Sequence, residues 1–151
     1  MTASLTRRYR FSASHRLHAA ALSDAENRHV YGKCNNPYGH GHDYELEVTI
    51  HGPVDTTTGL MAPLSVLDRY VETRILSRFR NKNINLDVPE FEHIVPTTEN
   101  LALVIANRLN SEWPLGREPD GRNLTRVYLQ ETGRNSFEVI LPRTRAEDEH
   151  E

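Results

Sequence analysis

Two runs of alternating apolar and polar residues in the first third of the chain predict two β-strands. Within residues 5–17, one face of the first strand carries Tyr9, Phe11, Ala13 and His15. Within residues 40–51, one face of the second strand carries His42, Tyr44, Leu46, Val48 and Ile50. The polar segment 18–39 between them predicts a loop with short helical pieces. Loops of this length in a compact domain often carry function.

A helical repeat follows, and two further strands close the chain. Pro63 can open a helix whose apolar positions recur at Leu64, Leu67, Val71, Ile75 and Phe79. Thr97 or Thr98 can cap a second helix, which has an apolar stripe at Leu101, Ile105 and Leu109. Residues 124–131 and 136–141 alternate again, which is typical of paired strands.

The order strand, strand, helix, helix, strand, strand predicts an α+β domain with an antiparallel sheet. Helices cover only one face of such a sheet, and its open edges favour an oligomer that pairs them. We expect one domain over residues 1–142 and a charged, disordered tail over residues 143–151.

Composition narrows the class of protein. A net charge of −3 gives no reason to expect nucleic acid as a partner. No apolar stretch is long enough to span a membrane, and the N-terminus has no signal core. Cys34 is the single cysteine, so no internal disulfide forms and a cytoplasmic location is expected.

Three histidines form a candidate metal site. His40 and His42 lie two apart on a predicted strand, so both imidazoles point to the same face. His15 lies on the preceding strand and joins them if the two strands pair. Three neutral imidazoles leave a fourth position open, which is typical of catalytic zinc. The competing interpretation is a set of surface or hydrogen-bonded histidines.

Two further residues have both a chemical and an ordinary interpretation. Cys34 follows Lys33, whose charge would lower a thiol pKa and favour a thiolate; otherwise Cys34 is a small buried apolar residue. Glu131 shares a strand face with Val127 and Leu129. Its carboxylate suits the paired N–H groups of an aminopyrimidine ring, or it forms an ordinary salt bridge.

Taken together, these residues resemble the 6-pyruvoyl-tetrahydropterin synthase family, which includes the 6-carboxy-tetrahydropterin synthases. The matching segments are FSASHRL at 11–17, YGKCNNPYGHGHDYELEVTIHG at 31–52, LDVPEF at 86–91, PTTENLA at 96–102, and the pair Glu131-Thr132. They run in family order over nearly the whole chain. The five residues between Cys34 and His40 resemble the pyruvoyl-forming branch.

The resemblance implies the tunnelling fold, a four-stranded antiparallel sheet with two helices on one face. Three subunits would close their sheets into a barrel, and two trimers would stack into a homohexamer. His15, His40 and His42 match the zinc ligands, and Cys34 matches the catalytic thiol. Glu131, Thr97 and Thr98 match positions that bind the pterin.

The implied reaction is that of a phosphate-eliminating lyase in tetrahydrobiopterin biosynthesis. It converts 7,8-dihydroneopterin triphosphate into 6-pyruvoyl-tetrahydropterin and inorganic triphosphate, with Zn²⁺ and no external redox cofactor. Zinc would acidify C–H and O–H bonds in the side chain of the substrate, and the Cys34 thiolate would take up a proton.

One departure from the family pattern concerns proton transfer. Family members usually read L-D-H-K-N after the first helix, and the Asp-His pair works with the cysteine. This chain reads FRNKN, with Arg80 and Asn81 at those two positions. Arginine stays protonated and asparagine does not titrate. His93 is a candidate substitute base, or an ordinary surface histidine; Arg80 instead suits a phosphate or carboxylate of a different substrate.

Three hypotheses remain. The first is a 6-pyruvoyl-tetrahydropterin synthase with a rearranged proton relay. The second is a zinc enzyme that cleaves a pterin side chain by aldolase-like chemistry. The third is a pterin-binding protein without turnover.

Overall fold

The computed structural model describes residues 1–116 and 121–142 and contains one five-stranded sheet in the order β3-β1-β2-β4-β5. The long strands are β1 (Thr2–His15), β2 (His40–Pro53), β4 (Asn123–Thr132) and β5 (Asn135–Ile140). β1 and β2 pair antiparallel over their whole length, as β2 does with β4 and β4 with β5 over shorter stretches. The alternating runs in the sequence therefore correspond to the four long strands.

The fifth strand was not predicted. β3 (Lys82–Asn83) pairs parallel with Ala13 and Ser14 of β1, so the sheet is mixed rather than wholly antiparallel. The backbone N–H of Asn81 donates to the Ser12 carbonyl at 2.7 Å and brings this segment alongside β1. A strand of two residues is too short to show an alternating pattern, which is why the sequence did not indicate it.

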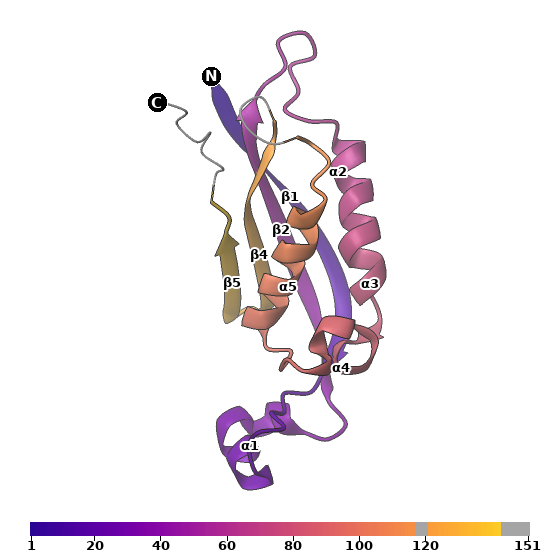
Figure 1. Cartoon of the computed structure of the whole chain (residues 1–151), viewed down its shortest axis with the longest axis vertical. Helices are drawn as coiled ribbons and strands as arrows, with labels where there is room; N and C mark the ends of the chain where they lie inside the picture. The colour runs from indigo at the N-terminus through magenta and orange to yellow at the C-terminus, as the bar shows by residue number, and fades with distance from the viewer. Residues whose placement is uncertain (117–120, 143–151) are drawn as a thin grey trace, which may run out of the picture.

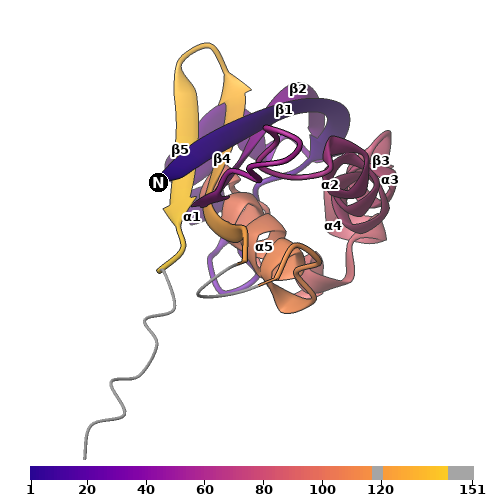
Figure 2. The ribbon, with the colours of Figure 1, turned by 90° about the horizontal axis from the view of Figure 1, so that it is seen from above.

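Two long helical segments cover one face of the sheet, as predicted (Figures 1 and 2). α2 (Leu64–Val71) continues through a π-helical turn (Glu72–Leu76) into α3 (Ser77–Phe79). α5 (Thr98–Ser111) begins at Thr97, whose side chain accepts a hydrogen bond from the Asn100 N–H. The choice between Thr97 and Thr98 as the N-cap is thereby resolved.

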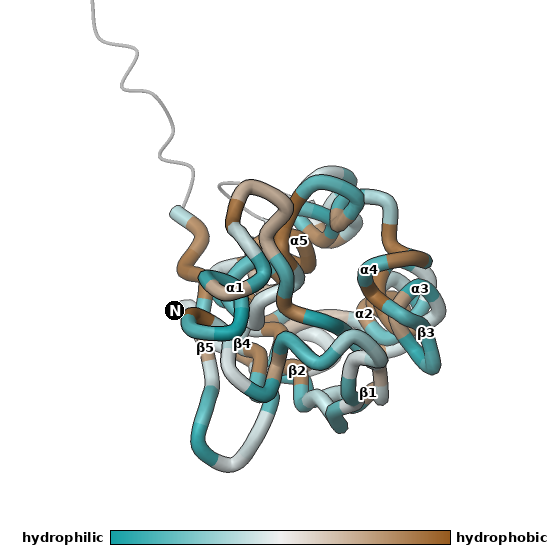
Figure 3. The backbone as a smooth tube through the Cα atoms, turned by 90° about the horizontal axis from the view of Figure 1, so that it is seen from below, coloured by the Kyte–Doolittle hydropathy of each residue, from teal (hydrophilic) through white to brown (hydrophobic). Residues whose placement is uncertain are grey.

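Short helices occupy the segments predicted as loop or irregular. α1 (Asp24–Tyr31) is followed by a 3₁₀ turn (Gly32–Asn35) and lies beyond one end of the sheet (Figure 1). Figure 3, viewed from that end, shows α1 as largely hydrophilic. α4 (Ile84–Asp87) and a 3₁₀ turn (Pro89–Glu92) lie at the same end of the sheet.

The core fills the space between the sheet and the helices. Phe11 stacks on Tyr44 with ring centroids 5.1 Å apart and also contacts Phe79 from α3. Fully buried residues come from both layers: Leu46, Val48, Ile50, Val127 and Leu129 from the sheet, and Leu67, Val71, Ile75, Leu101, Ile105 and Leu109 from the helices. The apolar face of the sheet ends at the histidines, because His15 and His42 continue the alternation that buries Phe11 and Tyr44.

Some expectations lie beyond what the structure describes. The tail over residues 143–151 is outside the described residues, and the assignment of residues 1–142 to one domain stays a prediction. Within the described part of the chain, no helix has the length and apolar character needed to cross a membrane.

Candidate metal and substrate site

The strand pairing brings the three predicted histidines together. His15 lies directly opposite His40 in the register of β1 and β2, and His42 lies opposite Ala13. The ligand nitrogens of the three side chains all lie within 4.8 Å of one another, and Nε2 of His15 is 3.1 Å from Nε2 of His40. His15 is buried and the other two are partly exposed. One ion could therefore contact all three imidazoles.

Backbone contacts orient His15 toward the centre of the cluster. Its Nδ1–H donates to the Pro96 carbonyl at 2.8 Å, which leaves Nε2 with a lone pair facing His40. Metal-ligating histidines are commonly oriented by such a hydrogen bond from the other ring nitrogen. Gly39, at φ +70°, lets the chain pass close to β1, since a Cβ there would lie 2.9 Å from the His15 carbonyl oxygen.

The protonation states of the histidines and an unsatisfied ring nitrogen are both compatible with a bound metal ion. Burial lowers the pKa of His15, and burial together with the nearby His42 lowers the pKa of His40. Both are therefore neutral near pH 7, the form that binds metals. Nε2 of His42 is buried and has no hydrogen-bond partner among the described residues. A buried nitrogen that makes no hydrogen bond is costly, and a cation would satisfy it.

Glu131 lies against the same cluster, from the end of β4. Its Oε1 is 3.4 Å from Nε2 of both His15 and His42, and its side chain is 13% exposed. The group of mutually close ligand atoms does not include Glu131, so three histidines remain the core of the site. The carboxylate therefore lies at the edge of the histidine cluster.

Cys34 lies in the 3₁₀ turn after α1 and is partly buried. Its carbonyl accepts a hydrogen bond from the Leu17 N–H at 2.9 Å, which ties this turn to the segment after β1. Burial and, secondarily, the Glu131 carboxylate raise the pKa of the Cys34 thiol. Lys33 does not contribute to this shift, so the interpretation in which its charge lowers the thiol pKa is not supported: desolvation of the thiolate and the negative charge of Glu131 determine the direction.

Two asparagines shape the segment that carries Cys34. Asn27 is fully buried, and its amide bonds to backbone groups of residues 19–23. Asn35 donates to the Leu17 carbonyl at 2.8 Å. Side-chain amides thus bond to backbone groups of the connection between β1 and β2, which has little regular backbone pairing of its own.

We expect Asn27→Ala to make the connection over residues 18–39 less stable. The substitution leaves three backbone carbonyls and one N–H without their amide partner, at a cost of about 1–3 kcal/mol for each buried group that water cannot reach. Limited proteolysis should then cleave within residues 18–39 faster than in the wild type, while α5 stays protected. Asn107→Ala, on the exposed side of α5, is the matched control and should leave the cleavage rate unchanged.

The two predicted pterin-binding threonines, Thr97 and Thr98, lie at the N-terminus of α5. Thr97 is the N-cap, and Thr98 is buried with 4% of its surface exposed. They are the next two residues after Pro96, whose carbonyl orients His15. The segment 96–98 therefore connects the histidine cluster to the first turn of α5.

The departure at Arg80 and Asn81 has a clear structural consequence. Arg80 forms a two-pronged ion pair with Glu72, at 2.8 and 2.9 Å, on the exposed side of the helix. Asn81 adopts φ +57°, a conformation that asparagine tolerates better than most residues. It lines a cavity of about 600 Å³ together with His42, and Ser12 and Asp43 line the same cavity.

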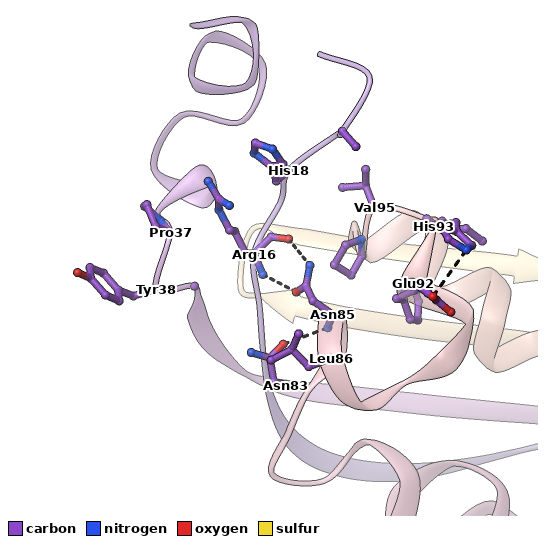
Figure 4. Close-up of a pocket in the computed structure, with 15 residues that line it drawn as sticks. Arg16, His18, Pro37, Tyr38, Asn83, Asn85, Leu86, Glu92, His93 and Val95 are labelled. Atoms are coloured by element: carbon purple, nitrogen blue, oxygen red, sulfur yellow. Dashed lines mark hydrogen bonds and ion pairs between the residues drawn. The ribbon is translucent and has the colours of Figure 1, made fainter. Parts of the chain in front are cut away.

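A cavity of about 490 Å³ is lined by Arg16 and His18, which follow β1 in the sequence (Figure 4). Asn85 clamps the Arg16 backbone, accepting from its N–H at 2.8 Å and donating to its carbonyl at 2.9 Å. His93, a candidate substitute base, lines this cavity with 87% of its side chain exposed and Glu92 at 3.9 Å. No sequence pattern indicated the roles of Asn27 and Asn85, because isolated buried asparagines follow no periodic spacing.

The fold and the site define an α+β protein with a cluster of three histidines that could hold a metal ion, with a carboxylate against it. The family model "6-pyruvoyl tetrahydropterin synthase" matches residues 4–140. The chain is 44% identical over 133 residues to human 6-pyruvoyl tetrahydrobiopterin synthase, covering 88% of each chain. It is 44% identical over 131 residues to the synthase of Drosophila melanogaster, covering 87% of this chain and 75% of the relative.

Solved structures agree. The structure of Caenorhabditis elegans 6-pyruvoyl tetrahydropterin synthase superimposes with a TM-score of 0.83 at 35% identity, covering 94% of this chain and 97% of that one. The chain belongs to the 6-pyruvoyl tetrahydropterin synthase family.

Proposed function

We propose that the protein is a zinc-dependent synthase that converts 7,8-dihydroneopterin triphosphate into 6-pyruvoyl-tetrahydropterin and inorganic triphosphate. The observation that carries this proposal is the convergence of His15, His40 and His42 next to Glu131, in a chain of this family. Cys34 supports it, because the Glu131 carboxylate, after burial, contributes to the raised pKa of the Cys34 thiol.

Each site residue has a proposed role. The three histidines hold Zn²⁺, which when bound supplies Lewis-acid polarisation of the substrate side chain. Glu131 accepts hydrogen bonds from the 2-amino and ring N–H groups of the pterin, and Thr97 and Thr98 line its binding position. Cys34 acts as a thiolate that takes up a proton from the side chain. Its raised pKa means that a further group must help it lose its own proton.

We further propose a homohexamer, a dimer of trimers whose sheets join into a barrel, in the cytoplasm. Strand β5 ends the sheet on one side and pairs only with β4 among the described residues. The long helices lie on one face, so the sheet edges and the other face are available for neighbouring copies (Figure 2). Analytical ultracentrifugation at working concentration tests the stoichiometry.

Glu131→Gln should weaken pterin binding while leaving the metal in place. The change keeps the shape of the side chain but removes the charge that strengthens its hydrogen bonds, a loss of about 1.5–3 kcal/mol or roughly 10–100-fold in Kd. Fluorescence titration with 7,8-dihydroneopterin measures this loss. Glu112→Gln, 75% exposed and directly after α5, should bind as the wild type does. An unchanged Kd for Glu131→Gln would remove the carboxylate from the proposed site.

A second candidate function follows from the residues at positions 80 and 81, because Arg80 is held in an ion pair with Glu72 and Asn81 does not titrate. With no Asp-His pair at positions 80 and 81, aldolase-like cleavage of the pterin side chain is an alternative fate for the bound molecule. Mass spectrometry separates the two: the synthase product retains all three carbons of the side chain, whereas the cleaved product is shorter. A pterin recovered unchanged after incubation with zinc-loaded protein would support binding without turnover.

Arg80→Asp together with Asn81→His should raise turnover if proton transfer is limiting. The pair restores a titratable group in the cavity that Asn81 shares with His42. General acid–base catalysis contributes about 10²–10⁴-fold, so an increase of at least about tenfold in kcat is expected. Arg80→Gln alone is the control, since it breaks the Glu72 ion pair without adding a titratable group. An equal kcat in the double variant and the wild type would mean that the native relay is complete.

A further inference from the structure

A cationic cavity of about 550 Å³ lies next to Cys34. Its charged walls come from three separate segments: Arg16 just after β1, Arg28 in α1 and Lys33 in the 3₁₀ turn. Lys33 and Asn35, which both line the cavity, flank Cys34 in the sequence. The turn that carries the thiol is therefore one wall of this cavity.

The three cations have no carboxylate partner at ion-pair distance within the described part of the chain. Other arginines in that part form ion pairs, such as Arg7 with Asp68 and Arg108 with Glu90. Arg16, Arg28 and Lys33 form no ion pair with any described residue, although the Asp24 side chain belongs to the same cavity lining. Three cations facing one carboxylate leave an excess of positive charge that an anion would neutralise.

The backbone of Arg16 is fixed, whereas its side chain is directed into this region. Asn85 holds the Arg16 N–H and carbonyl, and the guanidinium is directed toward the segment that carries Pro37 (Figure 4). Its Nε donates to the Asn35 carbonyl at 3.1 Å, which leaves the terminal nitrogens for another acceptor. Pro37 lines this cavity as well as the one shown in Figure 4.

We propose that Arg16, Arg28 and Lys33 bind the triphosphate group of the substrate and of the released product. This inference rests on the proposed function. The cationic cavity adjoins the histidine cluster through the chain, because Arg16 directly follows His15. The Leu17 N–H donates to the Cys34 carbonyl at 2.9 Å, and the two sequence neighbours of Cys34 line the cavity. A pterin anchored at Glu131 would thus extend its side chain past Cys34 and place its phosphates among the cations.

The cations would also serve the elimination itself. As a proton leaves a carbon of the substrate side chain, a carbon–carbon double bond forms and the neighbouring carbon–oxygen bond to the triphosphate breaks. The electron pair of that bond stays on the departing phosphate oxygen. Arginine and lysine side chains stabilise this added negative charge, and no oxidant or reductant is required.

The test is calorimetric titration of the zinc-loaded protein with inorganic triphosphate. Arg28 and Lys33 are exposed, so Arg28→Gln and Lys33→Gln should fold normally, as thermal melts can verify. We expect about a tenfold weaker Kd for each variant and a larger loss for the double variant. Arg78→Gln is the matched control, because Arg78 is exposed, forms no ion pair with a described residue and lies in α3. It should bind as the wild type does.

The outcomes separate this inference from the proposed function. Triphosphate also binds divalent cations, so metal content is measured after titration. Binding that is equally strong in the double variant and the wild type, or absent from the wild type, overturns the cationic subsite whether or not pterin is turned over. Triphosphate binding that is weakened by the Arg28→Gln and Lys33→Gln substitutions, in a protein that does not bind 7,8-dihydroneopterin, supports the subsite but contradicts the proposed function. The double variant should bind dihydroneopterin, which has no phosphates, normally.

Discussion

Replacing His42 with alanine is expected to abolish stoichiometric metal binding. The variant removes one of three imidazoles whose nitrogens lie within 4.8 Å of one another, and two ligands cannot define a site of this type. Loss of an outer-sphere partner alone costs about 10–100-fold in metal affinity, so loss of a direct ligand should cost at least about a hundredfold. Elemental analysis after dialysis against a mild chelator measures the remaining metal.

The control for His42→Ala is another histidine outside the cluster. His93 is 87% exposed and lies in a different cavity, so His93→Ala should retain one equivalent of metal. His42 is preferable to His15 as the test position, because His15 is buried and its removal would also leave a void. One equivalent of metal in His42→Ala, held as tightly as in the wild type, would contradict the three-histidine site.

Replacing Cys34 with serine should reduce kcat by about 10²–10⁴-fold while metal content and pterin affinity stay near the wild-type values. Serine keeps nearly the same volume in this partly buried turn, but its hydroxyl does not ionise near neutral pH. The hydrogen bond from the Leu17 N–H is accepted by the backbone of Cys34, so the turn should keep its position. Steady-state kinetics and a dihydroneopterin titration measure the two effects separately.

A kcat of Cys34→Ser within about twofold of the wild type would exclude the thiol from proton transfer. A parallel loss of zinc in this variant would assign Cys34 to the metal site instead. Cys34 is the single cysteine, so reaction of the wild type with a thiol reagent provides an independent check at the same position. Modification should abolish turnover in the wild type and leave Cys34→Ser unaffected.

The sequence predicted the parts of the fold that depend on repeating patterns. The alternation around Phe11 and Tyr44 follows from one face of the sheet packing against helices, so its strands and buried face were predictable. The same alternation placed His15, His40 and His42 on a shared face, and only the pairing of the strands had to be assumed. Glu131 was likewise placed on the correct face of its strand.

Other features depend on contacts that leave no periodic signal. Strand β3 exists because the Asn81 N–H reaches the carbonyl of Ser12, a residue far away in the sequence. Asn27 and Asn85 hold backbone segments through single amide groups, which a pattern of apolar residues does not reveal. The Cys34 pKa depends on burial and on Glu131, neither of which is evident from its neighbour Lys33. Such features come from tertiary contacts and needed the structure.

The proposal that this protein is a working synthase is tested most directly by incubating the zinc-loaded protein with 7,8-dihydroneopterin triphosphate and quantifying both products. We predict one equivalent of inorganic triphosphate released for each pterin consumed, and a new pterin that retains all three carbons of the side chain. This release should require the metal and should be lost in Cys34→Ser. Pterin recovered intact with no triphosphate released, from protein shown to contain zinc, would contradict the proposal.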